Sequence, residues 1–173
     1  MPISQGLKAG LAAGVVYGLM IGILHVSFIA ACSTDQLAYI TQQIATRNLQ
    51  NVTAQQIYST DLVVLPIYWG LGAMILGVLY GVTFGLLYKS IPGVDSRKKG
   101  IFLSIAVFGI GFFMGLPGYG IACTPAFMSF LPLVLSVPIS LAFGYLLGVF
   151  YDSFGRLAKE EKEEERNRSA TNS

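Results

Sequence analysis

Charge is scarce in this sequence of 173 residues, of which 12% are Asp, Glu, Lys or Arg and 54% are hydrophobic. Three long stretches contain no charged residue at all, namely 9–34, 62–88 and 100–151. A soluble domain of this length cannot bury so much apolar surface in one core. The scarcity of charge therefore predicts an integral membrane protein whose first partner is the lipid bilayer.

The residue types that carry most enzyme chemistry are nearly missing as well. The chain has a single histidine, His25, and two cysteines, Cys32 and Cys123. These are too few for a Cys/His metal cluster, and neither a phosphate-binding loop nor paired carboxylates occur in the apolar stretches. A net charge of +2 without a basic stripe argues against nucleic-acid binding. We expect no enzyme activity, no catalytic residue, no metal site and no cofactor.

The apolar stretches have room for four membrane-spanning helices. A helix needs about 20 residues to cross ~30 Å of hydrocarbon, and the stretch 100–151 can hold two helices with a Pro/Gly-rich break between them. The sequence thus predicts an all-α, four-helix transmembrane bundle within residues 1–155. The expected spans are residues 8–32, 63–88, 100–118 and 128–152. Residues 156–173 form a charged tail that should extend the last helix briefly and then fray.

Lysine and arginine are unevenly distributed around these spans. Of the 11 basic residues, Arg47 alone lies between the first and second spans. Because cytoplasmic flanks are enriched in Lys and Arg, we expect a multi-pass protein of the cell membrane with both termini in the cytoplasm. The segment 29–32 is similar to a lipoprotein cleavage box. The apolar stretch before it exceeds the ~7–15 residues of a signal core, which favours a span.

Small residues recur at every fourth position along the expected spans. The first span has Gly6, Gly10, Gly14, Gly18 and Gly22, the second has Ala73, Gly77, Gly81 and Gly85, and the fourth has Ser136, Ser140, Gly144 and Gly148. This spacing places them on one face of a helix, where they let two backbones approach closely in a membrane. We predict glycine-zipper packing within the chain. The alternatives, for the first span above all, are that the glycine face serves self-association or packing against other membrane subunits, or that it lines a pore.

Two parts of the chain also echo each other. Residues 80–90 (YGVTFGLLYKS) are similar to residues 143–153 (FGYLLGVFYDS). At the start of the first span, Lys8 and Gly10 echo the start of the third, with Lys99, Gly100 and Ser104. Two parallel helical hairpins related by an axis along the membrane normal would produce both echoes.

Only neutral polar residues fall deep within the expected spans. Among them, His25 falls in the outer third of the first span, and Tyr17, Tyr80 and Tyr145 fall deeper. An imidazole or hydroxyl in hydrocarbon needs a hydrogen-bonding partner. These residues are therefore either packing residues with satisfied polar atoms or candidates for a small polar ligand site.

The segment 33–61 should lie outside the membrane as two short amphipathic helices. In the first helix, Leu37, Ile40 and Ile44 share one face. Thr53 and Gln56 have the spacing of a capping box, which predicts the start of the second helix.

Two covalent modifications are suggested on the same side. Asn51 begins an Asn-Val-Thr sequon and is a candidate glycosylation site. Cys32 and Cys123 fall at the same level of the membrane. They form either a disulfide between the two hairpins or two buried free thiols.

From these features we expect a non-catalytic accessory or structural subunit that packs through its glycine faces. The alternative is a small transporter or channel component for a neutral or small solute. Because ion and polar-solute transporters usually need a polar site near the midplane, the lack of charge within the spans favours the first interpretation.

Overall fold

The computed structural model describes residues 2–113, 123–124, 128 and 130–171, and these residues form five α-helices and no strand. The helices are α1 (Pro2–Ala31), α2 (Ser33–Thr46), α3 (Ala54–Leu87), α4 (Ser96–Phe113) and α5 (Leu131–Thr171). Three of them, α1, α3 and α5, contain stretches that are long and apolar enough to cross a membrane. The predicted all-helical class is confirmed, and three helices within the described part of the chain could span a membrane.

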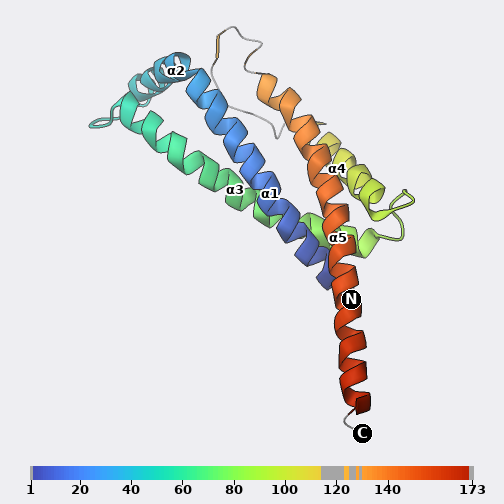
Figure 1. The fold of residues 1–173 in the computed structure, drawn as a ribbon. Helices are drawn as coiled ribbons and strands as arrows, with labels where there is room; N and C mark the ends of the chain where they lie inside the picture. Colours follow the sequence, from blue (N-terminus) through green and yellow to red (C-terminus); the bar gives the residue numbers. More distant parts are fainter. Residues whose placement is uncertain (1, 114–122, 125–127, 129, 172–173) are drawn as a thin grey trace.

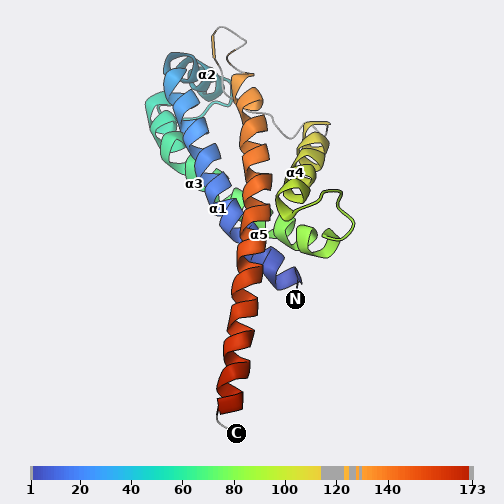
Figure 2. The same cartoon turned by 45° about the vertical axis from the view of Figure 1, so that its right-hand side comes forward.

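The long helices form two antiparallel pairs that meet near one end of the molecule (Figures 1 and 2). In the first pair α1 packs along α3, and in the second pair α4 packs along α5. α1 also packs on α5 and so joins the two pairs. We call the end that carries α2 the α2 end, and the opposite end, from which α5 projects, the tail end.

The helix that begins at Thr53 differs from the expectation. The Thr53 hydroxyl accepts the backbone N–H of Gln56 at 3.2 Å, and the Thr53 N–H donates to Gln56 Oε1 at 3.0 Å. This capping box starts α3, which continues through Pro66 to Leu87. The prediction of a second short helix in segment 33–61 is therefore wrong. The apolar residues after Thr53 extend the helix without interruption, and Pro66 is tolerated as prolines often are in apolar helices.

The first short helix of that segment is α2, which folds across the ends of α1 and α3 (Figure 1). Its buried residues are Gln36 and Ile40. The loop that follows turns at Asn48 and Asn51, whose φ angles of 50° and 65° are in the left-handed region. Asparagine tolerates this region better than most residues do, so the loop can reverse towards α3 without glycine.

α4 begins four residues before the expected third span of 100–118. The Asp95 carboxylate accepts the backbone N–H of Lys98 at 2.8 Å and caps the start of the helix. α4 is not among the three spanning candidates of the described residues, and Arg97, Lys98 and Lys99 occupy its first turn. Residues 114–118 of the expected span lie outside the described residues.

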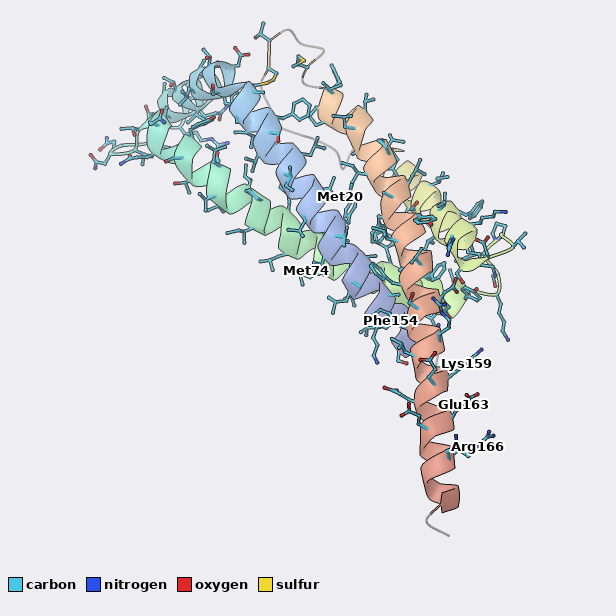
Figure 3. All side chains as sticks on the ribbon, viewed as in Figure 1. Met20, Met74, Phe154, Lys159, Glu163 and Arg166 are labelled. Carbon is cyan, nitrogen blue, oxygen red and sulfur yellow. A yellow bond between two sulfur atoms is a disulfide. The ribbon has the colours of Figure 1, made fainter. Side chains whose placement is uncertain are left out.

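α5 extends well beyond the expected fourth span of 128–152. The helix continues to Thr171, and Figure 3 shows Lys159, Glu163 and Arg166 on the part that projects past the other helices. The prediction that the tail frays soon after the membrane is wrong. Opposite charges four residues apart, such as Lys159 and Glu163, and a run of strong helix formers stabilise this part of the helix.

The buried side chains form two separate clusters. The tail-end core consists of Ala9, Ala13, Phe84, Ile91, Phe143, Leu147 and Tyr151. The α2-end core consists of Phe28, Ile29, Cys32, Ile40, Tyr58 and Cys123. The helix pairs are therefore held at two levels, one near each end of the molecule.

Candidate functional site

The glycines of α1 lie directly against the backbone of α3. A Cβ added to Gly10 would collide with the carbonyl oxygen of Gly77 and come within 2.7 Å of Gly81 Cα. The other tight contacts follow the same register: Gly6 against Gly81, Gly14 against Ala73 and Gly18 against Gly70. Only a residue without a side chain permits this approach. The glycine face of α1 from Gly6 to Gly18 is therefore occupied by α3 of the same chain.

The ends of this seam differ in tightness. A Cβ added to Gly22 would lie 3.5 Å from Pro66, which is an ordinary van der Waals distance. At the other end, a Cβ added to Gly6 would lie 3.2 Å from the Cα of Gly85, which is buried. The close contact is thus strongest towards the tail end.

α4 and α5 form a second seam of the same kind. A Cβ added to Gly100 would collide with the carbonyl oxygen of Gly144, and one added to Gly148 would collide with that of Ser96. A Cβ added to Gly144 would lie 2.5 Å from Ser104 Oγ. Gly144 of the predicted ladder therefore contacts Gly100 and Ser104 of α4, and Gly148 contacts the α4 backbone at Ser96 and Arg97.

The two seams correspond towards the tail end. The contacts of Gly6 with Gly81 and Gly85 match those of Gly100 with Gly144 and Gly148. Positions in α1 thus correspond to positions 94 residues later in α4, and positions in α3 to positions 63 residues later in α5. This register pairs Gly10 with Ser104. It pairs Lys99 with Gln5, whereas the sequence had suggested that Lys99 corresponds to Lys8.

Corresponding residues of α3 and α5 also meet across the boundary between the pairs. Tyr80 contacts Phe143 with ring centroids 5.7 Å apart, and Tyr88 stacks on Tyr151 at 4.8 Å. Between them lie Phe84 and Leu147, which also correspond and which are 0% and 1% exposed. Residues meet their own counterparts where a two-fold axis passes between two copies of a unit.

Two hydrogen bonds at the tail end repeat this relationship. Gln5 Nε2 donates to the carbonyl oxygen of Tyr151 at 2.6 Å, and Lys99 Nζ donates to that of Tyr88 at 2.6 Å. Gln5 and Lys99 correspond to each other, as do Tyr151 and Tyr88. The Lys99 ammonium also lies 4.2 Å from the centroid of the Tyr88 ring, where a cation is attracted to the π-face.

Ser96 connects the remaining polar groups at this end. Its Oγ lies 2.6 Å from the Tyr88 hydroxyl and donates to the Asp152 carboxylate, and the residue is 2% exposed. We call the whole group the tail-end junction; its members are Gln5, Tyr88, Ser96, Lys99, Tyr151 and Asp152. Sequence reasoning found no role for Gln5, Ser96 or Asp152. The available signal was the internal repeat, but the sequence did not define the offset between α1 and α4 well enough to align Gln5 with Lys99.

Two of the predicted deep tyrosines come together and the third does not. Tyr17 and Tyr80 both contact Phe143, with ring centroids 5.2 Å and 5.7 Å away. Tyr145 is 43% exposed, and the Arg97 guanidinium lies 5.7 Å from its ring centroid. The three hydroxyls therefore do not line one common site.

His25 is buried between α1 and α3. Its Nδ1 lies 3.2 Å from the carbonyl oxygen of Ile21, and its ring stacks on Trp69 with centroids 4.9 Å apart. Among the residues that the structure describes, no group of three or more His, Cys, Asp or Glu side chains could hold a metal ion. The histidine lies in a packed environment of rings and backbone.

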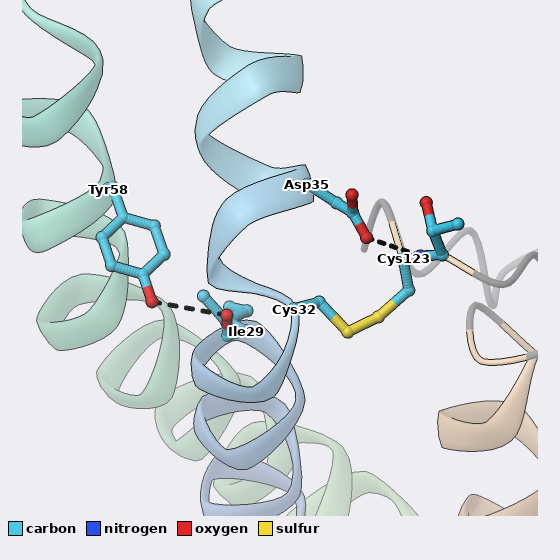
Figure 4. Close-up of a disulfide and its surroundings, with 6 residues drawn as sticks. Ile29, Cys32, Asp35, Tyr58 and Cys123 are labelled. Carbon is cyan, nitrogen blue, oxygen red and sulfur yellow. Dashed lines mark hydrogen bonds between the residues drawn. A yellow bond between two sulfur atoms is a disulfide. The ribbon is translucent and has the colours of Figure 1, made fainter.

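At the α2 end, Cys32 and Cys123 are joined by a disulfide with Cα atoms 5.3 Å apart (Figure 4). Beside it, the Thr124 N–H donates to the Asp35 carboxylate at 2.6 Å, and the Tyr58 hydroxyl donates to the carbonyl oxygen of Ile29 at 3.4 Å. Of the two alternatives that the sequence left open, the structure has the disulfide. Asn51 is exposed in the loop between α2 and α3 at the same end.

No protein-family model matches this chain, and neither the curated proteins nor the solved structures contain a match to it. Its function is therefore argued from its own geometry.

Proposed function

We propose that the chain is a four-span membrane protein built from two equivalent helical hairpins, and that it serves as a non-catalytic subunit or scaffold. The first hairpin is α1 and α3, and the second is α4 and α5. The observation that carries the proposal is the interior: close backbone contacts hold each hairpin together, and rings of corresponding residues meet at the boundary between the hairpins. Such glycine-zipper packing is how helices associate in lipid, and it leaves the outer surface for lipid and other subunits.

α4 would be the fourth span of the bundle. From Gly100 to Phe113 it contains no charged residue, and it packs along α5 through a seam that matches the one between α1 and α3. Its basic first turn would lie at the membrane surface, where long cationic side chains reach the headgroups.

The tail end would face the cytoplasm. The start of α1, the loop between α3 and α4, the first turn of α4 and the projecting part of α5 all lie at this end (Figure 1), and together they hold every Lys and Arg except Arg47. The positive-inside rule then puts both termini in the cytoplasm. The α2 end would face the oxidising side, where a disulfide persists.

α3 offers the best surface for a partner subunit. Of its most apolar stretch, 11% is buried within the chain, against 44% for α1. Large apolar side chains at every fourth position are more than half exposed along one face: Val63, Ile67, Leu71, Ile75 and Leu79. The α1 glycine face, which the sequence favoured for this role, is occupied by α3 and is not free for another subunit.

Extraction in mild detergent and identification of the co-purifying chains tests the subunit proposal. We expect a stoichiometric partner, or a second copy of this chain, that is lost when Leu71 and Ile75 are both replaced by alanine. The matched control replaces Leu19 and Ile23, which are equally exposed on α1, and should retain the partner. A chain that stays monomeric and alone in native-membrane nanodiscs would contradict the proposal.

A transporter or channel component for a neutral or small solute is the second candidate. The correspondence between hairpins favours it, because many transporters consist of repeats related by an axis along the membrane normal. In this structure Tyr17, Tyr80 and Phe143 close the boundary, so a path there requires the hairpins to separate. Solute flux through proteoliposomes of the purified chain would support transport, whereas a stable partner without flux supports the subunit.

A further inference from the structure

The two hairpins are joined unevenly along their length. At the tail end, hydrogen bonds and stacked rings connect all four long helices through the tail-end junction. The contact of Tyr17 with Phe143 lies about midway along α1. Beyond it, α1 and α3 lean away from α4 and α5 towards the α2 end (Figures 1 and 2). The arrangement resembles two arms that diverge from a common base.

At the α2 end the arms are connected through the residues that precede and begin α5. Cys123 is bonded to Cys32, and the Thr124 N–H is bonded to Asp35. Leu131, the first residue of α5, packs against the α2-end core. Among the residues described at this end, the disulfide is the covalent link between the arms, and it lies beside the Thr124–Asp35 hydrogen bond and apolar contacts (Figure 4).

The disulfide lies outside the correspondence between hairpins. Counted along the sequence with the same offsets, Cys32, which follows α1, would correspond to position 126, and Cys123, which precedes α5, would correspond to position 60. Neither cysteine has a cysteine counterpart, whereas the tail-end glycine contacts, the ring pairs and the hydrogen bonds of Gln5 and Lys99 do have counterparts. The disulfide is thus an additional link between two hairpins whose relative arrangement the repeated contacts already define.

We propose that the Cys32–Cys123 disulfide is a latch that holds the α2 ends of the hairpins together, with the tail-end junction as the pivot. The proposal rests on the two-hairpin arrangement proposed above. A dithiol reductant supplies two electrons and two protons, so the S–S bond becomes two thiols and the dithiol becomes its own disulfide. The α2 ends then separate, while the junction, which contains no cysteine, stays closed.

Distances between spin labels test the latch in the intact protein in lipid nanodiscs. Labels are attached to a ketone-bearing unnatural amino acid, so the native cysteines are untouched. One pair reports the α2 end, at Gln42 and Phe130, and the other reports the tail end, at Lys8 and Arg156; all four side chains are exposed. On reduction by dithiothreitol, confirmed by mass, the Gln42–Phe130 distribution should shift to longer distances and broaden. The Lys8–Arg156 distribution should remain unchanged, and reoxidation should restore the starting state.

Two variants complete the experiment. Replacing both cysteines, Cys32→Ser with Cys123→Ser, should reproduce the α2-end shift without reductant, whereas Asp35→Ala should leave the distance unchanged because the covalent link remains. An unchanged α2-end distance in fully reduced protein overturns the latch but not the two-hairpin proposal. A shift at the tail end on reduction overturns the pivot. A longer Gln42–Phe130 distance in Asp35→Ala would show that the hydrogen bond of Asp35, and not the disulfide, holds the α2 ends together, and this result overturns the proposal.

Discussion

At the scale of single residues, the close packing of α1 on α3 depends on glycines, which have no Cβ atom. An added Cβ at Gly10 meets the backbone of α3, whereas at Gly72, on α3 itself, nothing lies within 4 Å of it. The sequence shows both as glycines in apolar helices and predicts the contact only from the four-residue spacing. Which glycine faces a backbone and which faces open space depends on the rotation of two packed helices.

Gly10→Ala should therefore lower thermal stability in detergent, because overpacking of a tight contact costs about 1–3 kcal/mol. Gly72→Ala is the matched control on a helix of similar length. It should be neutral or raise the melting temperature, since alanine favours a helix by about 1 kcal/mol over glycine. Equal melting temperatures for the two variants would show that the seam is not a close contact.

The junction bonds permit a second test at this scale. Lys99→Met and Gln5→Met each remove one of two corresponding hydrogen bonds to a tyrosine carbonyl, and each should lower stability by about 0.5–1.5 kcal/mol. Lys98→Met changes the same charge at an exposed neighbour and should have no effect. The thermal midpoint of the purified protein is the readout. A large effect of the Lys98 variant would mean that surface charge, and not the junction bond, is being measured.

At the scale of helices, local sequence signals predicted where α3 begins, but they did not predict how far α3 and α5 extend. The Thr53 capping box is present, yet the helix that it starts is α3 and not a short surface helix. The charged tail continues α5 where fraying was expected. A capping signal specifies where a helix begins, but its end depends on what the following residues pack against and on charge pairs along its exposed faces.

Thr53→Ala should loosen the first turn of α3 by about 1 kcal/mol, while Thr53→Ser should preserve the cap. Hydrogen–deuterium exchange of the segment 54–58 measures this as several-fold faster exchange in the alanine variant alone. Exchange in the apolar part of α3 should not change. Matching exchange in both variants would show that packing against α2, and not the cap, holds the start of the helix.

At the scale of the whole molecule, the arrangement separates two chemically different ends. The basic residues other than Arg47 gather at the tail end, and the disulfide and Asn51 lie at the α2 end. Composition predicted this polarity. The structure adds that the hairpins are joined differently at the two ends. Repeated hydrogen bonds and ring contacts join them at the tail end, and a disulfide joins them at the α2 end.

Synthesis in microsomes that glycosylate proteins should modify Asn51, because the proposed orientation puts the α2 end in the lumen. Asn51→Gln should abolish the shift in gel mobility. The Asn167-Arg168-Ser169 sequon in the tail should stay unmodified and serves as the internal control. Modification at Asn167 instead would reverse the proposed orientation.

The sequence by itself determined the membrane class, the approximate helices and the small-residue faces, since length, hydropathy and four-residue spacing are properties of one helix in lipid. Only the tertiary structure decided that Gly10 faces Gly77, that Gln5 and Lys99 play the same part, and that Cys32 reaches Cys123. Glycine-rich apolar helices are alike in composition, so many pairings satisfy the same pattern. The register is set by how several helices fit together at once, and no single segment contains that information.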